Sequence, residues 1–74
     1  MEWSFDRERF WKAVRVKRMN LLKIARESGL SVGTVMNAAK GFSVSMYVFA
    51  KICYVLGCEL EYLRETYHGI FERS

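Results

Sequence analysis

The residues of this chain that could act as nucleophiles, bases or metal ligands are few and are not grouped. Cys53 and Cys58 lie five positions apart in an apolar run, and the single histidine, His68, is distant from both. This spacing fits neither a metal site nor a cysteine–histidine pair. Glu59 and Glu61 stand two positions apart, which places them on different faces of a helix. We therefore expect no catalytic residue, no metal and no cofactor, and we expect two buried cysteines in a reducing compartment.

Basic residues are concentrated in the first half of the chain. From Lys12 to Lys40 there are seven basic residues and one acid, whereas four acids and two bases follow from Glu59 onward. This asymmetry is typical of a first half that binds a polyanion. The length of 74 residues and the hydrophobic content of 51% suit a single domain over residues 1–74. We find no apolar run long enough to span a membrane and no signal peptide, so we expect a cytosolic protein.

The spacing of apolar residues predicts helices rather than strands, because it follows a period of 3.6 residues and not of two. Asn20, Ser31 and Ser45 stand where helix N-caps are expected. Three glycines close apolar segments, as helix ends favour: Gly29, Gly41 and Gly57. The expected helices span about residues 6–18, 21–28, 32–40, 46–56 and 59–67. The fourth is expected to turn these residues inward: Met46, Phe49, Ala50, Cys53 and Leu56.

Two of these short helices, between Asn20 and Gly41, are expected to cross steeply. Ala25 is small enough for close approach, Gly29 is free to take a positive φ in the turn, and Val35 faces back as a branched wedge. Ile24, Leu30 and Ala38 complete the shared core. This is the spacing of a helix-turn-helix, which presents its second helix to the DNA major groove.

From about Phe5 to Glu65 the chain resembles the lambda-repressor/Cro (Xre) family of helix-turn-helix regulators. After the motif come a glycine, a short loop, a capped helix, another glycine and a last helix, which read Gly41, FSV, SMYVFAKICYVL, Gly57 and CELEYL. The stretch KIC-x-x-LGC-x-L-x-x-L is similar to small stand-alone members. The resemblance implies an all-α, five-helix lambda-repressor-like domain with the helix-turn-helix at its second and third helices. It also implies a cytoplasmic protein that a bacterium or phage encodes.

The resemblance further implies roles for individual residues. Asparagine pairs with adenine and a valine methyl touches the thymine methyl, so the expected base-facing residues are Val32, Gly33, Met36 and Asn37. The expected phosphate contacts are Lys17, Arg18, Lys23, Ser31, Thr34 and Lys40.

The chain departs from the family in two ways that weaken direct base readout. Leu21 occupies the position where many members carry a phosphate-gripping glutamine, and only Asn37 and Lys40 are strong polar readers on the third helix. Specificity then depends on apolar contacts and DNA shape, or the domain has drifted toward binding protein.

Aromatic side chains on the outer face of the fourth helix indicate a second surface. Because aromatic residues are enriched in interfaces, we expect a homodimer contact through Tyr47, Val48, Lys51, Tyr54 and Val55. Such a dimer suits a palindromic operator with half-sites roughly 34 Å apart. Trp3, Phe5 and Trp11 are expected to cap the core rather than to stack on a ligand.

These observations predict a sequence-specific transcriptional regulator, a repressor that binds double-stranded DNA with its third helix in the major groove, and not an enzyme. The same residues allow a protein-binding antirepressor or modulator that pairs with another regulator. A third hypothesis, based on the acidic tail, is the DNA-binding half of a toxin–antitoxin pair. The sequence leaves open the operator, the regulated genes and any small-molecule effector.

Overall fold

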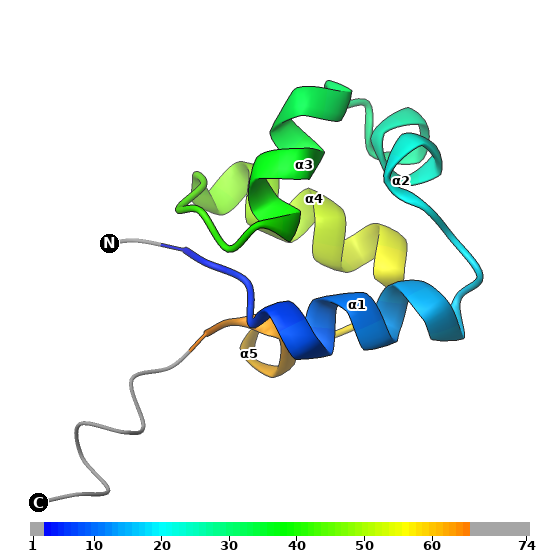
Figure 1. Ribbon diagram of the computed structural model, residues 1–74. Coiled ribbons are helices and arrows are strands. Elements are labelled where there is room, and N and C mark those ends of the chain that lie inside the picture. The colour runs from blue at the N-terminus through cyan, green and yellow to red at the C-terminus, as the bar shows by residue number, and fades with distance from the viewer. Residues whose placement is uncertain (1–2, 66–74) are drawn as a thin grey trace, which may run out of the picture.

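The structure, a computed structural model that describes residues 3–65, consists of helices joined by short turns, and the predicted all-α class is confirmed (Figure 1). The helices are α1 (Arg7–Val16), α2 (Leu21–Ser28), α3 (Val32–Ala39), α4 (Met46–Leu56) and α5 (Leu60–Leu63). The predicted bounds of the second, third and fourth helices agree with these within one residue, whereas the first and fifth are shorter than predicted. No helix in the described part of the chain is long and apolar enough to cross a membrane.

The first four helices each begin at a side-chain oxygen that closes the first turn. The predicted caps are confirmed, since Asn20, Ser31 and Ser45 accept from the N–H three residues on at 2.8, 3.2 and 3.2 Å. Asp6 caps α1 in the same way, through Arg9 N at 3.1 Å. Each bond satisfies an N–H that the helix itself leaves unpaired, so these four residues fix where the helices start.

The ends of α2, α3 and α4 are set by the three predicted glycines, which have φ values of +77°, +89° and +69°. The first helix ends differently. The sequence predicts an end at Arg18, but α1 stops at Val16 because Arg18 itself turns left-handed, with φ of +57°. The N–H groups of Arg18 and Met19 then donate back to Arg15 O and Val14 O, both at 3.0 Å. This is the hydrogen-bond pattern of a glycine-terminated helix, formed here by an arginine.

The fifth helix is also shorter than predicted, because the chain leaves it to pair with the N-terminal segment. Arg64 forms an antiparallel bridge with Phe5, and Asp6 N donates to Leu63 O at 2.7 Å. Trp3 bridges Val44 on the other side of this segment. The predicted extension of the helix to residue 67 is therefore wrong at residues 64 and 65, which are not helical. Residues 66 and 67 lie outside the described part of the chain. His68 also lies outside it.

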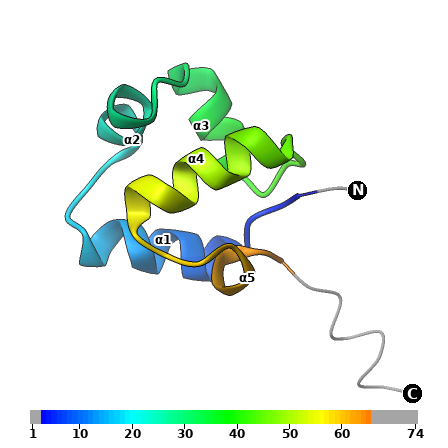
Figure 2. The same cartoon turned by 180° about the vertical axis from the view of Figure 1, so that it is seen from behind.

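The core lies between α4 and the other helices, whose arrangement Figure 2 shows from behind. Its buried side chains come from every element and include the predicted Ile24, Val35 and Phe49, together with Phe10 and Leu63. Phe5 stacks on Phe49 with ring centroids 4.1 Å apart, so the prediction that it caps the core is confirmed. Met46 does not turn inward as predicted. It is 57% exposed, because it stands in the first turn of α4, beside the loop that follows α3.

Two glycines near the helix-turn-helix provide a matched test of this backbone. A Cβ at Gly29 or at Gly33 would meet no atom within 4 Å, but only Gly29 has a positive φ. Gly29→Ala should therefore lower the free energy of unfolding by about 1 kcal/mol, because L-residues are strained in the left-handed region. Gly33→Ala should raise it by about 0.5–1 kcal/mol, because alanine is the better helix former. Urea denaturation measures both, and two changes of the same sign would contradict this account of the turn.

Candidate nucleic-acid interface

The crossing of α2 and α3 has the geometry that the sequence predicts. Ala25 and Val35 are both buried in the seam between the helices, and Gly29 makes the left-handed turn. Gly29 N and Leu30 N both donate to Ala25 O, at 3.0 and 3.1 Å. Because Val35, Ala38 and Ala39 turn into the core, the opposite side of α3 is left on the surface.

Two hydroxyl groups at the N-terminus of α3 form a hydrogen bond with each other. Ser31 Oγ and Thr34 Oγ1 are 2.8 Å apart, and Ser31 Oγ also accepts from Thr34 N. The two predicted phosphate contacts thus lie together at the start of α3. Since helix N-termini favour anions, the chemistry of this end suits a phosphate group.

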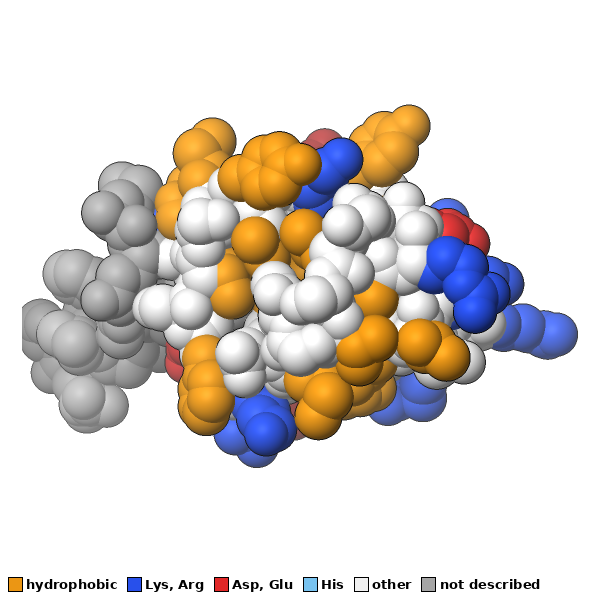
Figure 3. All heavy atoms as spheres, turned by 90° about the horizontal axis from the view of Figure 1, so that it is seen from above, with side chains coloured by type: hydrophobic (Ala, Val, Ile, Leu, Met, Phe, Trp, Pro, Cys, Tyr) orange, Lys and Arg blue, Asp and Glu red, His pale blue; other side chains and the backbone are white. Residues whose placement is uncertain are grey.

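The four predicted base-facing residues share the open side of α3. Val32 and Met36 are 38% and 41% exposed, and Gly33 and Asn37 are exposed beside them. The side-chain amide of Asn37 makes no hydrogen bond within residues 3–65, so both its donor and its acceptor are available to a base edge. Viewed from above Figure 1, the end of the molecule that carries α2 and α3 displays hydrophobic side chains, with Lys and Arg in separate patches around its rim (Figure 3).

The predicted phosphate-binding cations are not all together. Lys23 lies exposed in the first turn of α2, and Lys40 lies exposed at the end of α3. Lys17 instead lies against the C-terminus of α4. Its Nζ is 3.1 Å from the position that a Cβ on Gly57 would take. A cation at this end of a helix interacts favourably with the helix dipole. Arg18 occupies the turn between α1 and α2.

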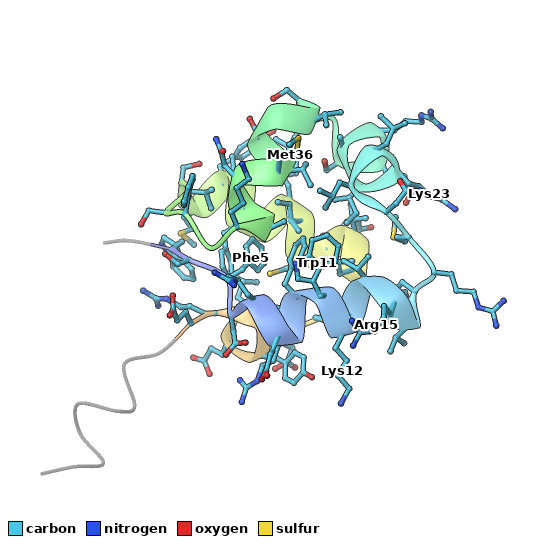
Figure 4. The ribbon with its side chains drawn as sticks, viewed as in Figure 1. Phe5, Trp11, Lys12, Arg15, Lys23 and Met36 are labelled. Atoms are coloured by element: carbon cyan, nitrogen blue, oxygen red, sulfur yellow. The ribbon has the colours of Figure 1, made fainter. Side chains whose placement is uncertain are left out.

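Sequence reasoning missed a groove beside this surface. The groove, of about 350 Å³, is lined by Arg7, Trp11, Leu21, Met36, Ala39 and Lys40. Trp11 extends from α1 toward Met36 on α3, whereas Lys12 points away from α3 (Figure 4). The one signal in the sequence was the spacing of Arg7 and Trp11, which stand one helical turn apart and therefore share a face of α1. Trp11 caps the core only in part, since it remains 37% exposed.

The predicted interface on α4 divides into exposed and half-buried residues. Tyr47 and Tyr54 are 66% and 86% exposed, and Lys51 Nζ lies 5.6 Å from the centre of the Tyr47 ring. Val48 and Val55 are half-buried and pack against the core. Phe42 is also largely exposed, in the loop between α3 and α4.

The two cysteines differ in burial, since Cys53 is buried and Cys58 is only half-buried. Burial raises the pKa of the Cys53 thiol from 9.0 to about 12, and the neighbouring Cys58 adds to the rise. A thiol that stays protonated at neutral pH is a poor nucleophile and a poor metal ligand. Within residues 3–65, no group of three or more His, Cys, Asp or Glu side chains is arranged to hold a metal ion.

Comparison with known proteins identifies similar domains. The sequence model of the family described as the Cro/C1-type HTH DNA-binding domain matches residues 9–67. Among solved structures, the crystal structure of the transcriptional regulator VanUg, Form II, is similar with a TM-score of 0.67 and 25% sequence identity, over 86% of this chain and 83% of that chain. Comparison with curated proteins gave no match.

The raised pKa of Cys53 makes the fold sensitive to alkaline pH. The unfolded chain ionises this thiol near its ordinary pKa of 9.0, whereas the folded chain holds the proton until about 12. The unfolded state therefore binds fewer protons in this window, and stability falls as the pH rises through it. Denaturation from about pH 8 to about pH 11 should show a steeper loss of stability for the parent than for Cys53→Ala. Cys58→Ala is the control and should keep most of the slope, because burial is the larger cause. Parallel slopes for the parent and Cys53→Ala would contradict this assignment.

Proposed function

The chain belongs to the Cro/C1-type helix-turn-helix DNA-binding family, and from this membership we propose that it is a transcriptional repressor that recognises its operator with α3 in the major groove. It represses by occupying the promoter. A solved protein similar to this chain is called a transcriptional regulator, which supports a role in regulation here.

The observation that carries the proposal is the open side of α3. This helix of eight residues is buried along one side and exposed along the other, where Gly33, Met36 and Asn37 follow one another. The major groove of B-DNA is about 12 Å wide and admits a helix with its side chains. The absence of a side chain at Gly33 lets the backbone of α3 approach the base edges closely.

Base recognition rests on one polar group and on apolar contacts. The Asn37 amide pairs with an adenine through one donor and one acceptor. Val32 and Met36 contact thymine methyl groups, because both present exposed apolar atoms on the same side of α3. With a single polar reader, the remaining specificity comes from the shape and deformability of the DNA.

Phosphate contacts flank this reading surface at both ends. Lys23 and the capped N-terminus of α3 bind one part of the DNA backbone, and Lys40 binds another. Lys17 is left out of this set, because its ammonium group lies at the end of α4. Each contact releases condensed counterions, so binding should weaken steeply with salt.

A two-fold dimer is part of the proposal. α4 carries the exposed Tyr47 and Tyr54 on the side that faces away from the core. Rigid aromatic side chains bury a large area at little entropic cost, which suits them to an interface between two copies. Palindromic half-sites about 34 Å apart would match such a dimer.

A protein-binding function on the same fold is the second candidate. It is favoured by the exposed hydrophobic side chains around α3, namely Leu22, Val32, Met36 and Phe42. An antirepressor or modulator would use them against another regulator. It would co-purify with that regulator and show no affinity for any DNA sequence.

Selection of bound sequences from a random DNA pool, at two salt concentrations, separates the two candidates. The repressor proposal predicts an enriched palindrome and affinity that falls steeply between the two concentrations, because several phosphates are contacted. Enrichment of no sequence would contradict it. A single non-repeated site would contradict the dimer alone.

Asn37→Ala tests which residue reads the bases. We expect the variant to lose preference at one position in each half-site and to bind the best site about 1–3 kcal/mol more weakly. Fluorescence anisotropy of labelled operators that differ at single positions measures both effects. Lys12→Ala is the control, since Lys12 points away from α3 (Figure 4) and should change neither. An unchanged base preference in Asn37→Ala would show that another surface reads the DNA.

A further inference from the structure

The groove between α1 and α3 continues the surface assigned to DNA. Met36 and Lys40 stand one turn apart on α3 and belong both to that surface and to the groove. Leu21 contributes from the first turn of α2, and Arg7 and Trp11 contribute from α1. Any ligand seated on the open side of α3 near Met36 therefore lies next to α1 as well.

Arg7 reaches the groove because Gly41 has no side chain. A Cβ at Gly41 would stand 3.1 Å from Arg7 Cδ and 3.4 Å from Cγ, so the stem of the arginine lies directly across this glycine. Arg7 and Lys40 both line the groove. Within residues 3–65 Arg7 forms no ion pair, so its charge is not already neutralised by a carboxylate.

Three acidic residues line a different hollow, which shares Arg7 with the groove. Asp6, Glu8 and Glu65 line a notch that also includes Arg7 and Lys40 but none of the apolar groove residues Trp11, Leu21 and Met36. The two cations thus separate an acidic notch from an apolar groove. An anion is repelled on the acidic side, so it is best received on the side of the groove.

The floor of the groove is apolar and aromatic. Trp11 is 37% exposed and Met36 is 41% exposed, and Leu21 and Ala39 complete the floor. A surface with an apolar floor and two cations at one end fits a ligand that alternates apolar and anionic groups. The backbone of a DNA strand has this pattern, since each deoxyribose is followed by a phosphate.

We infer that the groove seats the sugar–phosphate backbone of one operator strand, with a phosphate between Arg7 and Lys40 and a deoxyribose against Trp11 and Met36. This inference rests on the proposed repressor function and extends its footprint to α1. It also gives Leu21 a role: where a glutamine would grip a phosphate, leucine packs against the sugar. Arg7 then adds one phosphate contact that neither the motif nor the charge pattern of the sequence indicates.

The two tryptophans allow a direct test on the intact chain. Labelling with 5-fluorotryptophan gives two ¹⁹F resonances, one from Trp11 in the groove and one from Trp3, which packs on Phe49 and lies under Arg64. On addition of the selected operator, the Trp11 resonance should shift and lose its sensitivity to exchange of water for D₂O. The Trp3 resonance is the internal control and should stay in place. Trp11→Phe assigns the two signals.

Two basic residues on α1 test the phosphate contact. Arg7→Ala should reduce the slope of log K against log salt concentration by about one, because one phosphate contact is lost. Lys12→Ala removes the same charge from the side of α1 that points away from α3 (Figure 4), so its slope should equal that of the parent. Thermal unfolding of both variants establishes that the fold is kept.

The outcomes separate this inference from the function on which it rests. Operator binding with an unmoved Trp11 resonance, or with equal slopes for the parent and Arg7→Ala, would overturn the groove contact and leave the repressor standing. No binding to any DNA would overturn both. Binding with a shifted Trp11 resonance and a reduced salt slope for Arg7→Ala would support the contact between the groove and the DNA strand.

Discussion

The close crossing of α2 and α3 is the constraint on which the rest of the structure depends. It requires a small residue in the seam, a left-handed turn and a branched residue that faces back, and Ala25, Gly29 and Val35 meet these needs in turn. A larger residue at position 25 would separate the helices, and a turn without Gly29 would be strained. Because one side of α3 is buried in the core, its opposite side faces solvent. The candidate interface is thus a direct consequence of how the two helices pack.

The remaining elements hold this pair and distribute the surfaces around it. α4 lies behind α3 and supplies Phe49, on which Phe5 stacks, so the N-terminal segment is fixed to the core (Figures 1 and 2). Pairing of Phe5 with Arg64 then brings the start and the end of the described chain together beside α1. This pairing fixes the position of α1, so that Trp11 and Met36 line the same groove. The apolar face of α3, its flanking cations and the groove on α1 therefore form one continuous surface, and the aromatic residues of α4 form another.

The sequence predicted well those features that are encoded locally. The starts of α2, α3 and α4 follow from Asn20, Ser31 and Ser45, and their ends from glycines, because caps and left-handed turns depend on a few adjacent residues. No glycine marks the left-handed turn at Arg18, so the sequence predicts the end of α1 wrongly. The end of α5 was misplaced because it depends on pairing with Phe5, which is remote in sequence. For the same reason the site was predicted only in part: the residues on α3 follow from its period, but the groove of Arg7 and Trp11, and the position of Lys17 over Gly57, depend on how separate helices meet.

Amide chemical shifts measured by NMR during titration with the selected operator test most directly the claim that the crossing presents α3, with the adjoining part of α1, to DNA. The account predicts that the largest changes fall on residues 31–37, with further changes at residues 7–11 and 21–23, and that α4 and the end of α1 near Lys17 change little. Changes confined to α4 or to the end of α1 near Lys17, with α3 unaffected, would contradict it.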